Sequence, residues 1–181
     1  MSFVFVSGRP SLDYAGTLKW RRRDQGEEQL HSPADLASWA SLASLGDLTD
    51  GPVDFAAAIS AREAIYRVIR SRLDGAAPAV TDVGLINALA RGPRLTPTLL
   101  ADGHLTRTGT TEELLATLAA DLLDLLSSDE INRVKGCANN DCTRLYVDAS
   151  RLGNRQWCGM AECGNRAKVS AFRARRRTSA N

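Results

Sequence analysis

Four cysteines near the C-terminus are the residues of this sequence best placed to do chemistry. They are Cys137, Cys142, Cys158 and Cys163, two pairs of C-x4-C spacing with fifteen residues between the pairs. Each pair can close a knuckle, and two knuckles can meet at one tetrahedral zinc ion. An iron–sulfur cluster would use the same ligands, but its usual runs place three cysteines close together. Disulfides are rare in cytosolic chains, so the spacing predicts one structural zinc ion per chain.

Catalytic groups are harder to find than metal ligands. Four thiolates fill the coordination sphere of zinc and leave no position for a reactive water. His31 and His104 each stand alone in expected loops. The sequence contains no nucleophile–base motif and no phosphate-binding glycine loop. We therefore expect no enzymatic activity and no catalytic residue.

Formal charge is unevenly distributed along the chain. Residues 1–136 contain 14 Lys and Arg against 18 Asp and Glu, whereas residues 137–181 contain 9 against 3. Basic side chains crowded on one helix repel one another unless an anion joins them. The candidate nucleic-acid contacts are Arg166, Lys168, Arg173, Arg175, Arg176 and Arg177. The alternative is a solvated helix that only keeps the protein soluble. For Arg166, which lies next to the second knuckle, the alternative is a structural role in which it bonds loop carbonyl groups.

The elements expected around the cysteines form a small metal-stapled unit. Residues 145–147 are predicted to be a strand, with residues 155–157 as its partner and Gly153-Asn154 as the turn. A helix is expected from Cys163 to about Arg177, with Val169 and Phe172 packed inward. A knuckle, a hairpin and a helix that starts at the last ligand indicate a treble-clef-like finger. So small a unit needs a metal to hold it together.

The preceding 130 residues are predicted to form a mostly helical α+β body with a few strands. Helices are expected after Ser32, from about Asp54 to Asp74, after Thr81 and from Leu114 to Leu126. Thr110 and Glu113 have the spacing of a capping box. A strand is expected at residues 3–6 and a hairpin within 96–107, while the charged stretch 19–31 is expected to be a loop or an exposed hairpin.

One segment of the body is a candidate ligand pocket. Arg9 lies between Gly8 and Pro10, in the turn that follows the first expected strand. An arginine in such a turn could face an anionic small molecule. The alternative is a structural turn in which Arg9 pairs with Asp13.

Length and composition indicate two modules in one soluble chain. The 181 residues fit a body over 1–130 and a finger over 131–181, each with its own core. No stretch is apolar enough to span a membrane, and the N-terminus lacks the features of a secretory signal. We expect a cytoplasmic, nucleoid-associated protein. One small finger seldom binds a specific DNA site tightly, so we also expect a homodimer.

Two parts of the sequence resemble known families. The run Cys158-Gly159-Met160-Ala161-Glu162-Cys163-Gly164-Asn165-Arg166 resembles the CGNR zinc-finger family, as do Leu145-Tyr146-Val147-Asp148 and Trp157-Cys158. Gly8-Arg9-Pro10-Ser11-Leu12-Asp13-Tyr14 and Arg62-Glu63-Ala64-Ile65-Tyr66 resemble the ABATE domain that commonly precedes this finger. The resemblance implies a bacterial stress-induced transcription regulator. Gly16 departs from the pattern, since the family often has Asn before the Thr that corresponds to Thr17.

These observations favour one function and leave others open. The leading hypothesis is a zinc-dependent regulator whose finger contacts double-stranded DNA while the acidic body senses a small-molecule effector or mediates assembly. The runner-up is a zinc-stabilised module that docks an acidic partner protein without contacting DNA. RNA is a third partner class, although stacking aromatics beyond Tyr146, Trp157 and Phe172 are lacking.

Overall fold

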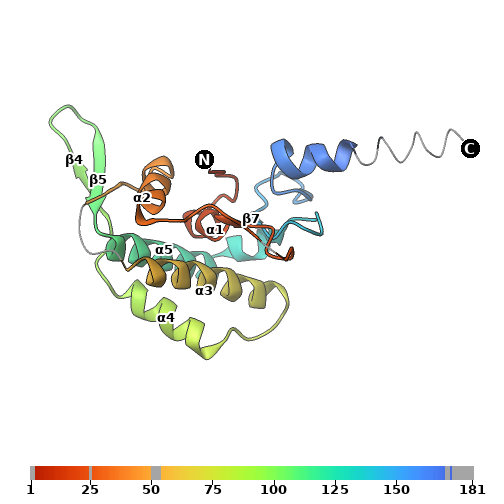
Figure 1. Cartoon of the computed structure of the whole chain (residues 1–181), viewed down its shortest axis with the longest axis horizontal. Helices are drawn as coiled ribbons and strands as arrows, with labels where there is room; N and C mark the ends of the chain where they lie inside the picture. Colours follow the sequence, from red (N-terminus) through yellow and green to blue (C-terminus); the bar gives the residue numbers. More distant parts are fainter. Residues whose placement is uncertain (1–2, 25, 50–53, 170–171, 173–181) are drawn as a thin grey trace, which may run out of the picture.

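A computed structural model of the chain describes residues 3–24, 26–49, 54–169 and 172, with only the backbone at Glu162. Three long helices, α3 (Phe55–Leu73), α4 (Val80–Ala90) and α5 (Thr111–Ser127), pack side by side and form most of the body (Figure 1). The short α1 (Pro10–Ala15) lies on α3 and α5, and α2 (Pro33–Leu42) lies beside it. The α+β class with a mostly helical body is confirmed.

Local hydrogen-bonding residues set where the helices begin. The Ser32 side chain accepts from the Asp35 N–H at the start of α2, and Asp54 does the same for Ala57 at the start of α3. Thr110 and Glu113 form both bonds of the expected capping box of α5. The prediction for α4 was wrong in detail. That helix begins at Val80 after Ala79, so Thr81 lies within its first turn and does not cap it.

The strands of the body are short and form two small sheets. β4 (Thr96–Leu99) and β5 (Leu105–Gly109) make the expected antiparallel hairpin, and β3 (Asp47–Leu48) pairs with β5 in parallel. Gly103, at φ +84°, takes the left-handed position in the turn of the hairpin. β1 (Leu18–Lys19) and β2 (Glu27–Glu28) pair antiparallel within the charged stretch. Residues 3–6, expected to be a strand, have no regular secondary structure.

The finger follows a turn of 3-10 helix, η1 (Asp129–Arg133). β6 (Val134–Gly136) and β7 (Leu145–Val147) pair antiparallel on either side of the first cysteine pair. Of the second pair, Cys158 precedes η2 (Met160–Gly164) and Cys163 lies within it. This turn of π-helix continues as α-helix from residue 165. β7 was therefore predicted correctly but residues 155–157 are not its partner. Gln156 instead accepts one hydrogen bond from the Ala138 N–H through its carbonyl oxygen.

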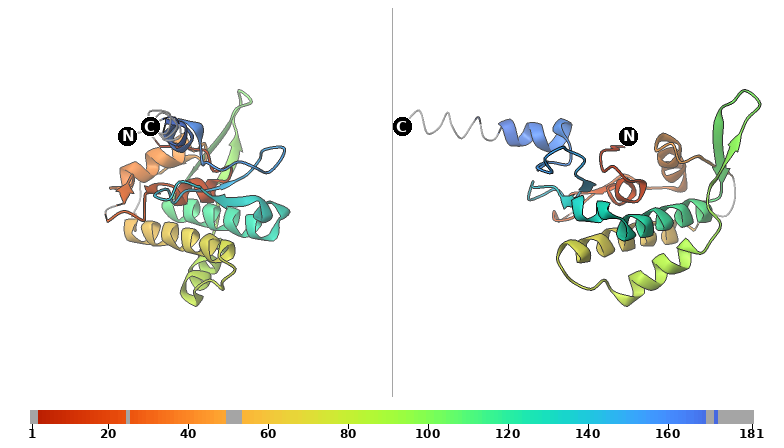
Figure 2. Two further views of the ribbon diagram at one scale, coloured as in Figure 1. Left: turned by 90° about the vertical axis from the view of Figure 1, so that its right-hand side faces the viewer. Right: turned by 180° about the vertical axis from the view of Figure 1, so that it is seen from behind.

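The finger shares the core of the body, which corrects the expectation that each module has a core of its own. Val134, Leu145 and Val147 of the finger belong to the same buried cluster as Leu12 of α1. The N–H of Val147 also donates to the carbonyl oxygen of Ser7 at 2.8 Å. Figure 2 shows the finger helix at one end of the molecule and the β4–β5 hairpin at the other. None of the described helices is both long and apolar enough to cross a membrane.

Candidate metal centre

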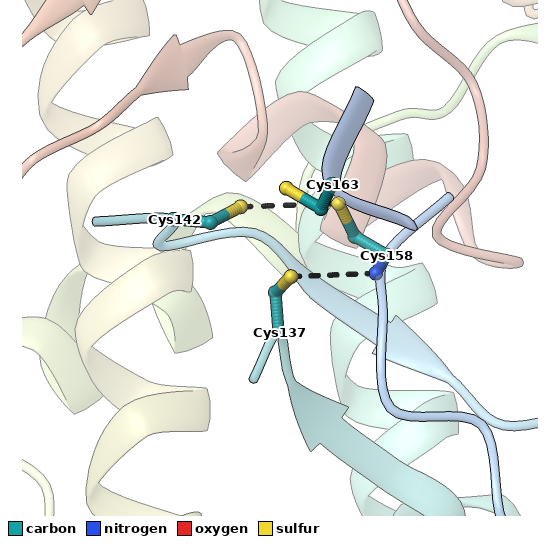
Figure 3. Close-up of side chains that lie close together, drawn as sticks. All are labelled: Cys137, Cys142, Cys158 and Cys163. Carbon is teal, nitrogen blue, oxygen red and sulfur yellow. Dashed lines mark hydrogen bonds between the residues drawn. The ribbon is translucent and has the colours of Figure 1, made fainter. Parts of the chain in front are cut away.

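The four cysteine side chains meet at one point (Figure 3). Their Sγ atoms all lie within 4.8 Å of one another, and none forms a disulfide. The Sγ atoms of Cys142 and Cys158 are 3.8 Å apart. A tetrahedron with zinc–sulfur bonds of about 2.3 Å has an edge of about 3.8 Å. The sulfur positions therefore fit a zinc ion, and the four cysteines predicted from spacing are the four that the fold brings together.

Backbone hydrogen bonds shape the two knuckles that carry these ligands. The Cys137 N–H donates to the Arg144 carbonyl oxygen at 3.0 Å, and the Cys142 N–H donates to the Asn139 carbonyl oxygen at 2.9 Å. These bonds close the first knuckle inside the β6–β7 hairpin. In the second, the Gly164 N–H reaches the Gly159 carbonyl oxygen at 2.9 Å. This i+5 bond makes the single π-turn that separates Cys158 from Cys163.

The electrostatics of the cluster suit a bound cation. Hydrogen bonds from the Cys142 and Cys158 thiols lower the pKa of Cys137 to about 2. Burial, and then the charges of Cys142 and Cys137, raise the pKa of Cys163 to about 12. Hydrogen bonding to Cys137 and Cys142 likewise raises the pKa of Cys158. Because thiols this close cannot all ionise without a positive ion, the donor set calls for a divalent metal that prefers thiolates, as zinc does.

Comparison with known proteins agrees with this geometry. Residues 8–129 match the ABATE family, described as "Putative stress-induced transcription regulator". The chain belongs to the ABATE family. Residues 133–176 match the CGNR zinc finger, so all four cysteines of this ABATE protein lie within the matched finger and are able to hold one zinc ion. No curated protein matches the chain.

A buried carboxylate fixes the loop between the two knuckles of the ABATE protein. Asp148, which is 1% exposed, accepts hydrogen bonds from Lys135 Nζ at 2.7 Å, from the Ser150 hydroxyl and from the Arg155 N–H. The Lys135 bond, followed by the Ser150 bond, holds the pKa of Asp148 well below its usual range. Sequence reasoning did not find this role. The position of Asp148 directly after a strand and two residues ahead of Ser150 is typical of a turn-forming aspartate, and it could have indicated this role.

The body contributes an aromatic residue to the metal centre, which the sequence analysis also missed. Trp20 packs against the four cysteines and Tyr146, and it is 6% exposed. The guanidinium carbon of Arg23 lies 4.6 Å from the centre of the Trp20 ring, and that of Arg166 lies 4.9 Å from a ring centre of the same side chain. The metal centre is therefore built by both parts of the chain.

The arginine triplet beside Trp20 is only partly a solvated loop. Arg21 is half-buried and pairs with Glu63 at 3.1 Å. Arg22 donates to the Asn140 carbonyl oxygen at 2.7 Å, and Arg23 pairs with Asp141 at 2.7 Å. Two of the three arginines thus hold the first knuckle against the body.

The described part of the basic helix has exposed cations and exposed apolar residues. Arg166 and Lys168, two of the predicted anion contacts, are exposed. Val169 is 48% exposed and Phe172 is 55% exposed, so the prediction that both pack inward was wrong. The remaining predicted contacts, Arg173, Arg175, Arg176 and Arg177, lie outside the described residues. His31 and His104 are exposed, and neither belongs to the one metal-ligand cluster found among the described residues.

The side chains of Arg9 and Asp13 bond other residues, and the two residues meet only through the Asp13 N–H, which donates to the Arg9 carbonyl oxygen at 3.0 Å. The Arg9 guanidinium forms ion pairs with Asp121, Asp124 and Glu130. Asp13 accepts from the N–H groups of Val6 and Ser7, both at 3.0 Å. The alternative interpretation, an ion pair between Arg9 and Asp13, was wrong about the partner of the Arg9 guanidinium. Arg9 instead joins the start of α1 to the end of α5, a structural use of its charge.

Proposed function

We propose that this protein is a zinc-stabilised transcription regulator that binds double-stranded DNA through its finger, with a body that senses a small-molecule effector or mediates assembly. The observation that carries the proposal is the basic segment that starts at the last zinc ligand. Residues 137–181 have a formal charge of +6 and residues 1–136 a charge of −4. DNA, as a polyanion, would be attracted by the finger and repelled by the body.

The metal centre gives this basic segment a defined starting direction. Cys163 is fully buried, and helical backbone runs from η2 through residue 169. Arg166 and Lys168 therefore leave the zinc site on a fixed scaffold. Four thiolates saturate the ion, so the metal acts structurally in this proposal and the protein acts by binding and not by catalysis.

Salt dependence of DNA binding tests the proposal. Neutralising about four phosphates gives a slope of log affinity against log salt of roughly −3.6. Changing Arg173, Arg175 and Arg177 to Ala should flatten the slope by roughly 2.7, because three phosphate contacts disappear. Zinc content and the unfolding midpoint should stay unchanged. A wild-type slope in this variant would place the DNA contact elsewhere and contradict the proposal.

A matched control removes three arginines at the opposite end of the molecule. Arg91, Arg94 and Arg107 are exposed; the first two precede β4 and the third lies in β5. Figure 2 shows the β4–β5 hairpin at the opposite end of the molecule from the finger helix. Their joint change to Ala alters net charge by the same amount. We expect this control to keep the wild-type slope, so that a flattened slope reports position and not total charge.

The body borders the finger at a groove suited to sensing. This groove has a volume of about 630 Å³ and is lined by Tyr66, Arg70 and Leu73 of α3 and by Lys135 and Arg155 of the finger. A small molecule bound there would contact both parts of the chain. A body that instead mediates assembly would give a homodimer, and sedimentation at two protein concentrations measures that state directly.

A second candidate function is docking to an acidic protein. The exposure of Val169 and Phe172 on the basic helix favours it, because apolar side chains beside cations suit an acidic protein surface better than a phosphate backbone. This candidate predicts either no DNA binding or DNA binding whose affinity depends only weakly on salt. The same titration therefore separates the two functions.

A further inference from the structure

We propose that Trp20 and Arg166 form a clamp that fixes the basic helix of the finger to the body. In this inference Arg166 is a positioning residue and not one of the phosphate contacts. The clamp would decide the direction in which the basic segment leaves the zinc site. The inference rests on the proposed DNA-binding function, but its geometry exists without DNA.

The contact of the Trp20 side chain with two guanidinium groups is the first observation. Arg23 comes from the same loop of the body, and Arg166 comes from the finger helix, three residues after Cys163. A guanidinium over an indole ring is attracted by the electron density of the ring face. The ring therefore links the body to the first turns of the finger helix.

The backbone of Trp20 is the second observation. Its φ of +54° is in the left-handed region, which bulky residues seldom occupy. Such a conformation persists only where the surroundings hold it. The surroundings here are the cysteine cluster, against which the ring packs with 6% of the residue exposed.

The hydrogen bonds and the ion pair between the same loop and the first knuckle are the third observation. The Arg21 N–H donates to the Thr143 hydroxyl at 3.3 Å, next to Cys142. Arg22 and Arg23 bind Asn140 and Asp141 on the other side of that cysteine. The loop that bears Trp20 is thus tied to the first knuckle, while Arg166 ties the helix after the second knuckle to Trp20. Together these contacts connect the first knuckle to the helix after the second knuckle through the loop that bears Trp20.

A comparison of two single variants separates positioning from phosphate contact. Arg166→Met keeps an apolar stem but removes the charge, and Lys168→Met does the same two residues further along the exposed helix. Loss of one phosphate contact flattens the salt slope by about 0.9. We expect Lys168→Met to do so. Arg166→Met should weaken binding about fivefold at constant salt, the equivalent of one cation–π contact, with a nearly unchanged slope.

A double-mutant cycle tests whether Arg166 acts through Trp20. Trp20→Leu removes the ring face, and Trp20→Phe keeps an aromatic face. If the clamp exists, Arg166→Met has no further effect on DNA affinity in the Trp20→Leu background but keeps most of its effect in the Trp20→Phe background. Zinc stoichiometry of each variant shows whether the metal centre has formed. Should Trp20→Leu fail to fold, the Trp20→Phe arm and the Arg166 slope still decide the matter.

Hydrogen exchange of the free protein makes the test independent of DNA. We expect Arg166→Met to speed exchange of the amides at residues 165–169 several-fold, while Lys168→Met leaves them near wild type. Wild-type protein that fails to bind DNA would refute the proposed function and leave the clamp to be judged by exchange. Unchanged exchange in Arg166→Met, together with a slope flattened by about 0.9, would overturn the clamp and make Arg166 a phosphate contact.

Discussion

At the scale of single residues, the body depends on a buried arginine. Arg62 of α3 is 1% exposed, and its guanidinium bonds both carboxylate oxygens of Glu28 at 2.5 and 2.7 Å. It also bonds Glu63 at 2.8 Å and the Thr17 hydroxyl at 3.3 Å. The pair joins β2 to the longest helix. This buried pair can stabilise the fold because every nitrogen of the Arg62 guanidinium is hydrogen-bonded, whereas a buried charge without a partner is costly.

Changing Arg62 to Met should therefore destabilise the protein strongly. The side-chain volume is nearly kept, but Glu28 and Glu63 lose their shared partner, which costs about 3 kcal/mol in the free energy of unfolding. Chemical denaturation measures the change. Arg72→Met, on an exposed position of the same helix, is the control and should stay within about 0.5 kcal/mol of wild type. Equal effects of the two variants would contradict the importance of the buried pair.

The same cluster predicts a pH dependence of stability. Burial raises the pKa of Glu28 and of Glu63, but hydrogen bonds from Arg62 and Arg21, respectively, outweigh it, so both pKa values lie below 4.5 in the folded protein. The unfolded chain then binds protons first as pH falls. The stabilisation is complete above about pH 4.5 and is lost progressively below it.

Denaturation at a series of pH values from neutral to about 3 checks this dependence, since ordinary carboxyl groups titrate near pH 4. The free energy of unfolding should fall with pH in that range. The fall should be shallower in Arg62→Met, because without the guanidinium the pKa values of Glu28 and Glu63 are lowered less in the folded protein. A steeper fall in the variant would be incompatible with the assigned cause.

At the scale of elements, helix starts follow from neighbouring residues and strand partners do not. Ser32, Asp54 and Thr110 each cap a helix by bonding an N–H three residues ahead. The partner of β7 depends instead on the first knuckle. That knuckle brings Gly136 opposite Leu145, so β6 takes the place expected for residues 155–157. Arg155 is used differently, with its guanidinium carbon 4.2 Å from the centre of the Tyr146 ring.

The capping box of α5 offers a test at this scale. Thr110→Ala removes the hydroxyl that accepts from the Glu113 N–H at 3.2 Å. We expect a loss of about 1 kcal/mol in unfolding free energy, as for other N-cap deletions. Thr98→Ala, on the exposed strand β4, serves as the control with little expected change. A loss in the control as large as that in Thr110→Ala would rule out a specific capping effect.

At the scale of the whole molecule, the zinc finger and the body form one structure. Val134, Leu145 and Val147 complete the core of the body, and Trp20 completes the surroundings of the metal. Cooperative unfolding of both parts follows from a shared core. Metal binding should then stabilise the entire chain and not the finger alone.

Cys163→Ser should accordingly lose zinc and lower the unfolding midpoint of the whole chain in a single transition. Elemental analysis should find one zinc per wild-type chain and none in the variant, because three thiolates with a buried hydroxyl hold the ion poorly. Ser60→Ala, an exposed position on α3, controls for a surface change. Iron in the wild type would contradict the zinc assignment, and an unchanged body transition in the variant would contradict the shared core.

The sequence by itself determined the ligand set, most helix starts and the division of charge. Cys137, Cys142, Cys158 and Cys163 could be identified because metal ligation and N-capping depend on residue types at short, fixed spacings. The resemblance to the ABATE and CGNR families was confirmed by the family matches over residues 8–129 and 133–176.

Only the tertiary structure decided which distant residues meet. Trp20 reaches the cysteines across more than a hundred residues, and Arg9 finds carboxylates on α5 and η1 in place of its neighbour Asp13. Val169 and Phe172 were placed inward because helical spacing marks a face, but the described fold puts both at the surface. A pattern specifies the side of a helix on which apolar residues gather, whereas burial requires another part of the chain to cover that side.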